Sequence, residues 1–95
     1  MRPLWGRAAA HQIYAALAYR EGAIHKAVLA LDQAIDAFDK EQFGLHSWCC
    51  RYQRGRLRGG SEGNRELEAA ANWMAEQGVK APEAMVRVNC PGFGE

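Results

Sequence analysis

The sequence has 95 residues, of which 48% are hydrophobic and 24% are charged. Its 12 Lys and Arg residues nearly balance its 11 Asp and Glu residues, so the net charge is +1. These values fit one small globular domain and exclude collagen-like and disordered chains, as well as a general attraction to nucleic acid or to an anionic membrane. We expect a cytoplasmic protein, because the sequence has no secretory signal, no bilayer-spanning apolar run and only three cysteines.

Residues 1–78 are expected to form a helical domain, and residues 79–95 a partly extended tail. The first helix covers about residues 3–20, where Pro3 suits the first turn, alanine is frequent, and Gly22 follows as a stop. The second helix covers residues 23–39. Its apolar residues recur every three or four positions, at Ile24, Ala27, Val28, Leu31, Ala34, Ile35 and Phe38.

The third helix is expected over residues 41–58, with an apolar stripe of Leu45, Trp48, Cys49 and Tyr52. Gly44 and Gly55 should weaken it by about 1 kcal/mol each. Residues 59–61 then predict a turn, and a fourth helix follows over residues 62–77. Its inner stripe is Leu67, Ala70, Ala71 and Met74. The period of two that marks strands is absent, so the predicted fold is all-α, with two antiparallel helical hairpins.

A shift of 34 residues aligns the first helix with the third. Two pairs then combine large residues and one combines the small Ala15 with the small Cys49; the aligned pairs are His11 with Leu45, Tyr14 with Trp48, Ala15 with Cys49, and Ala18 with Tyr52. A small residue lets a neighbouring helix approach closely, so this spacing indicates a structural repeat.

The stretch from His11 to Asp39 resembles a tetratricopeptide repeat. Tyr14 and Ala15 match the large-small pair of its first helix, and Gly22 matches the glycine at its turn. The packing positions of its second helix correspond to Ile24, Ala27, Leu31 and Ala34. Ala18 departs from the aromatic residue that is usual there, and residues 59–63 lengthen the turn of the second unit. The resemblance implies two hairpins stacked as a short solenoid.

The last 40 residues are similar to the C-terminal end of large bacterial proteins in which a Ser/Thr kinase or a signalling ATPase precedes such repeats. The similar residues are those at 55–60, Trp73-Met74, Gln77-Gly78, Pro82, Met85 and Pro91-Gly92-Phe93. The chain itself has no phosphate-binding loop and no kinase catalytic loop, so the similarity implies a fragment or a descendant of such a C-terminus.

In a tetratricopeptide-like unit, the first helix of each hairpin lines a concave groove that faces a partner. The helical phase places there Gln12, Ala16, Tyr19 and Arg20 from the first unit and His46, Cys50, Gln53 and Arg54 from the second. Aromatic and Arg side chains are frequent in binding hot spots, so this groove suits a protein or peptide. The alternative is a solvated helix face.

The densest charge feature is a basic patch of Arg51, Arg54 and Arg58 on one helical face. It suits a phosphate group or an acidic peptide. The favoured interpretation is instead pairing within the chain, because antiparallel packing brings this face to the carboxylates of the preceding helix, which are Asp32, Asp36 and Asp39.

His46, Cys49 and Cys50 lie within one helical turn, where His46 and either cysteine suit a zinc ion or a redox function. The spacing matches no compact zinc motif, so no metal and no cofactor are expected. With no catalytic constellation, the sequence predicts a protein-protein interaction module that forms a homo-oligomer or docks on a larger protein, and not an enzyme. The alternatives are a structural end-piece without its own ligand and a small metal- or redox-responsive regulator.

Overall fold

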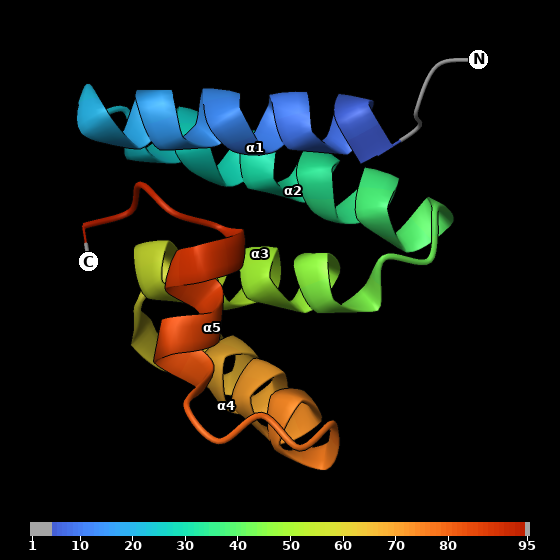
Figure 1. The fold of residues 1–95 in the computed structure, drawn as a ribbon. Helices are drawn as coiled ribbons and strands as arrows, with labels where there is room; N and C mark the ends of the chain where they lie inside the picture. Colours follow the sequence, from blue (N-terminus) through green and yellow to red (C-terminus); the bar gives the residue numbers. More distant parts are fainter. Residues whose placement is uncertain (1–4, 95) are drawn as a thin grey trace.

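The computed structural model describes residues 5–94, and Figure 1 shows that this part of the chain is built from stacked helices. They are α1 (Trp5–Arg20), α2 (Ile24–Lys40), α3 (Gly44–Arg58), α4 (Gly60–Glu76) and α5 (Pro82–Asn89). The described residues contain no strand, so the all-α prediction is confirmed. The predicted start of the first helix at residue 3 lies outside the described residues.

The first four helices pack as two stacked hairpins, as predicted. The helix α1 packs on α2 and α3 packs on α4, while α2 packs on α3 and so joins the hairpins. In Figure 1 the pair α1 and α2 lies above α3, α4 lies below it, and α5 crosses in front of α3. This leaves one face of α1 and one face of α3 turned toward the C-terminal part of the chain.

Three helices end in the same way, with a residue of positive φ two positions after the last helical residue. These residues are Gly22, Gln42 and Gly78. The next amide then bonds back to the carbonyl five residues earlier, as in the bond from Ala23 N to Ala18 O at 2.9 Å. This geometry closes a helix with a sharp turn and favours glycine, so the sequence correctly indicated the stops at Gly22 and Gly78. At the third turn Gln42 takes the same conformation, with φ 63°.

The turn between α3 and α4 is shorter than predicted, because Gly60 and Ser61 already belong to α4 and only Gly59 lies between the helices. The two helices then diverge from a point of very close contact. A Cβ atom on Gly55 would lie 2.8 Å from the backbone oxygen of Gly63, and a Cβ atom on Gly63 would overlap the Gly55 oxygen. Gly55 therefore allows the crossing of α3 and α4, a contribution that the sequence analysis had counted only as a loss of helix stability.

The predicted tail is partly wrong, since residues 82–89 form the helix α5 with Pro82 in its first turn. Pro82 fits because the first turn of a helix needs no hydrogen bond from its N–H group. The helix buries Val86 and packs on α3 and α4. The residues after Asn89 are not helical, as expected, but Phe93 among them is fully buried.

The core is made of small and apolar side chains from α1 to α5, together with Cys90 and Phe93 of the C-terminal part. The small residues Ala15 and Cys49, which the 34-residue shift aligns, are both fully buried. Tyr14 is not part of the core, because its side chain is 54% exposed. On α2 the predicted stripe is buried at Ala27, Leu31, Ala34, Ile35 and Phe38, and Ile24 is exposed.

Replacing Gly63 with Ala should lower the free energy of unfolding by about 2 kcal/mol or more, because the methyl group must push α3 away from α4. Gly6→Ala is the control, since nothing lies within 4 Å of a Cβ atom there and alanine favours the helix. Urea unfolding followed by circular dichroism measures both variants. A Gly63→Ala protein as stable as the Gly6→Ala protein would contradict the close packing of the two helices.

Candidate functional site

Several of the predicted groove residues on α1 and α3 contact a short stretch of the chain's own C-terminal part. This stretch, residues 89–94, is called the C-terminal segment. Gln12 donates a hydrogen bond from Nε2 to the main-chain oxygen of Asn89 at 2.7 Å. Gln53 donates one from Nε2 to the main-chain oxygen of Cys90 at 2.9 Å. One helix from each hairpin thus binds the backbone of the same segment.

The far end of the C-terminal segment is held by an aromatic contact. The ring of Phe93 lies 5.6 Å from the ring of Tyr19 and is fully buried. Gly92 and Gly94 both have positive φ and come close to α1: a Cβ atom on Gly92 would lie 2.9 Å from Cβ of Ala16. A Cβ atom on Gly94 would lie 2.5 Å from the Tyr19 hydroxyl. The segment therefore fits against α1 only because these two positions have no side chain.

We use the name groove face for the residues that touch this segment, namely Gln12, Ala16 and Tyr19 on α1 and Cys50 and Gln53 on α3. Beside it lies an open, mostly apolar pocket of about 230 Å³. Its lining consists of Gln12, Ile13, Ala16, Leu17, Arg20, Pro91 and Gly92. Ile13 and Leu17 are 62% and 52% exposed, so α1 presents apolar surface next to the segment.

The predicted site residues divide into two groups. Gln12, Tyr19 and Gln53 contact the C-terminal segment, and Arg20 lies in the rim of the pocket. His46 and Arg54 instead contact residues of other helices, outside the groove face as defined by the contacts of the C-terminal segment. The ring of His46 stacks on Phe38 of α2, with centroids 5.1 Å apart, and Arg54 bonds to carboxylates of α2 and α4.

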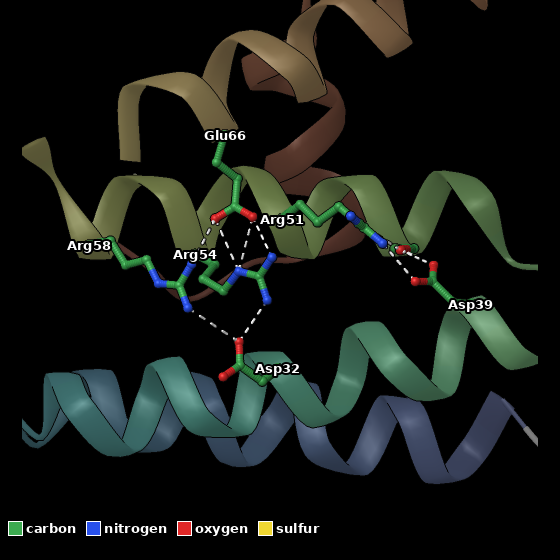
Figure 2. Close-up of polar contacts among 7 residues, drawn as sticks. Asp32, Asp39, Arg51, Arg54, Arg58 and Glu66 are labelled. Atoms are coloured by element: carbon green, nitrogen blue, oxygen red, sulfur yellow. Dashed lines mark hydrogen bonds and ion pairs between the residues drawn. The ribbon is translucent and has the colours of Figure 1, made fainter. Parts of the chain in front are cut away.

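Arg54 is the centre of an ion-pair cluster that joins three helices (Figure 2). Its Nη1 lies 2.7 Å from Oδ1 of Asp32 on α2, and its Nε and Nη2 donate to the carboxylate of Glu66 on α4. The side chains of Arg54 and Glu66 are each only 15% exposed. The hydrogen bonds to Glu66 raise the pKa of the Arg54 guanidinium above its ordinary value, and those to Asp32 add to this. The guanidinium therefore stays charged where it is partly buried.

The other two arginines of the basic patch are also paired within the chain, which confirms the favoured interpretation. Arg51 bonds to Asp39 at 2.6 Å and lies over the ring of Trp48. Arg58 lies 3.9 Å from Asp32. Asp36 differs from the prediction, because its partner is the exposed Lys40, one turn along the same helix. The patch is thus satisfied internally and leaves little of its charge for an anionic ligand.

The cysteines are placed differently from what the metal or redox alternative assumed. Cys49 is fully buried, and this burial, with the neighbouring Cys50, raises the pKa of its thiol to about 12. His46 packs among aromatic rings. Within residues 5–94, no three His, Cys, Asp or Glu side chains come close enough together to hold a metal ion. Cys50 instead meets Cys90, with their Sγ atoms 3.8 Å apart.

The sequence analysis missed that Asn89, Cys90 and Phe93 are part of this site. The run Pro91-Gly92-Phe93 was a signal, since an aromatic ring gains much free energy from burial. The glutamines were another signal: Gln12 and Gln53 lie on inward positions of their helices, where an amide must find a hydrogen-bond partner.

Comparison of the chain with models of known protein families, with curated proteins and with solved structures finds no match. Across residues 5–94, no helix is long and apolar enough to cross a membrane. The geometry of the groove face is therefore the basis on which a function can be assigned.

Replacing Arg54 with Ala should lower the free energy of unfolding by about 2–3 kcal/mol, because the carboxylate of Glu66 would remain mostly buried without its partner. Arg58→Ala is the matched control. Its side chain is 42% exposed and its contacts are long, so we expect a loss below about 1 kcal/mol. Urea unfolding at moderate salt compares the two variants, and equal losses would argue against a central contribution of Arg54.

Proposed function

We propose that the chain is a protein-interaction module of tetratricopeptide type that binds a short non-helical peptide of a partner protein on the groove face. The supporting observation is the C-terminal segment, which is non-helical from Cys90 onward and is bound by residues from both hairpins. The glutamine amides of Gln12 and Gln53 bind main-chain oxygens, which every peptide offers. Specificity then comes from the site that holds the ring of Phe93, because this site buries an aromatic side chain against Tyr19.

In this proposal the C-terminal segment acts as an intramolecular competitor of the partner peptide. A tethered segment has a high effective concentration near its binding site, so it lowers the affinity for any external peptide without abolishing binding. The segment is short, and contacts of this kind at the end of a helix open locally more easily than the packed helices do. The exposed pocket beside it, with Ile13 and Leu17, gives the partner a first point of contact.

The proposal predicts that loosening the C-terminal segment strengthens binding of an external peptide. The probe is a fluorescent peptide with the sequence of residues 88–95 and Ser in place of Cys90, titrated into the full chain and followed by fluorescence anisotropy. Phe93→Ala in the chain removes the buried ring, and Gly92→Ala introduces a Cβ atom against Ala16. Each variant should bind the probe at least about tenfold more tightly, which corresponds to about 1.4 kcal/mol of lost competition.

Two controls make this test specific. Val88→Ala changes a side chain that is 77% exposed, just before the segment, and should leave the affinity unchanged. The double variant Gln12→Ala/Gly92→Ala should bind the probe more weakly than the single variant Gly92→Ala, because one hydrogen-bond donor to the peptide backbone is lost. If neither loosened variant binds the probe while circular dichroism shows folded helices, peptide binding by the groove face is wrong.

A structural end-piece is the second candidate, and the full burial of Phe93 favours it. In that case the C-terminal segment is a permanent cover that protects the groove face, as terminal caps do in repeat proteins. It fits the similarity to the C-terminal ends of bacterial signalling proteins. The peptide titration separates the two candidates, since a permanent cover predicts no binding to the variants, only lower stability.

A further inference from the structure

Two thiols from distant parts of the chain meet where the C-terminal segment packs on α3. Cys50 lies in the middle of α3, and Cys90 is the residue that follows α5, 40 positions later. Their Sγ atoms are 3.8 Å apart, and both side chains are fully buried. A disulfide bond has a length of about 2 Å, so the two sulfur atoms need to approach by roughly 2 Å.

The backbone around Cys90 permits this approach. Cys90 has left the helical conformation, with φ −143° and ψ 67°, and it is followed by Pro91 and by Gly92 with positive φ. A rotation of its side chain is therefore not limited by a continuing helix. Cys50 Sγ also lies 3.6 Å from Oε1 of Gln12, so the thiol pair borders polar groups and is not enclosed by hydrocarbon alone.

Cys49 is not an alternative member of this pair. Neighbouring residues of a helix point about 100° apart, so Cys49 and Cys50 face different sides of α3. Cys49 is fully buried in the hydrophobic core. Its raised pKa, about 12, leaves almost no thiolate to react at neutral pH.

We propose that Cys50 and Cys90 are a redox site, which oxidised glutathione or a similar small disulfide converts into an intramolecular disulfide bond. One cysteine, as thiolate, attacks the small disulfide, forms a mixed disulfide and releases one thiol. The second cysteine then attacks the mixed disulfide at the protein sulfur and releases the other thiol. Two S–H bonds of the protein and one S–S bond of the oxidant are replaced by one protein S–S bond and two small-molecule thiols, which take up the two electrons and protons.

The reaction starts when the C-terminal segment opens, because both thiols are buried while it is bound. The product fixes residue 90 on α3 and thereby prevents the segment from leaving the groove face. The redox site itself depends only on the sulfur geometry. Its effect on a partner rests on the proposed function: oxidation would close the peptide site and reduction would open it again.

The test is to incubate the folded full chain with oxidised glutathione, block remaining thiols with N-ethylmaleimide in denaturant at neutral pH, and map the tryptic peptides by mass spectrometry. We expect peptides 41–51 and 88–95 to be linked, with a mass lower by two hydrogen atoms than their sum, and fragmentation to place the bond on Cys50. The oxidised chain should also melt about 10 °C or more higher, because the bond closes a long loop.

Cys49→Ala is the matched control and should give the same linked peptides, whereas Cys50→Ala should not. A wild-type chain that keeps three alkylated thiols, or that forms a bond involving Cys49, overturns the proposal without the need for any variant. Probe-peptide binding is measured separately on oxidised and reduced chain. A disulfide that forms but leaves the affinity unchanged overturns the peptide proposal and supports the redox site alone.

Discussion

The arrangement of the hairpins depends on one guanidinium group, that of Arg54. It bonds at once to Asp32 of α2 and to Glu66 of α4, and so fixes α3 between the two neighbouring helices (Figure 2). The helix α3 is rich in arginine and has few large apolar residues, so a polar contact with directed bonds sets its orientation where hydrophobic burial alone would not. In that orientation Cys50 and Gln53 contact Cys90 of the C-terminal segment, and Cys50 also lies beside Gln12 of α1.

The sequence predicted the four long helices because their periodicity, alanine content and glycine stops are local signals. It did not predict α5, whose short length and mixed composition carry little local information and whose stability comes from packing on α3 and α4. The turn at residue 59 was predicted too long, because the run Gly59-Gly60-Ser61 is typical of a turn. Gly63 lies within the helix and permits the contact with Gly55. The local sequence of one helix does not show which residues of another helix it contacts.

The candidate site was predicted in part for a similar reason. The helical phase correctly brought Gln12, Tyr19 and Gln53 to one face, since residues of one helix share a face at fixed spacings. The other two predicted residues of α3 make different contacts: His46 stacks on Phe38 of α2, and Arg54 pairs with carboxylates of α2 and α4. What occupies the face was not predictable from local patterns, because it comes from residues 77 positions away.

The large sequence separation between Gln12 and Asn89 also has a consequence for the order of folding. The contacts inside each hairpin join near neighbours in the chain, so they form early, whereas a contact that closes a loop of this length is slow and late. Each molecule should therefore pass through a stage in which the hairpins are complete and the face between α1 and α3 is still bare. A chaperone or a second chain present at that stage would meet Tyr19, Cys50 and Gln53 before the molecule covers them itself.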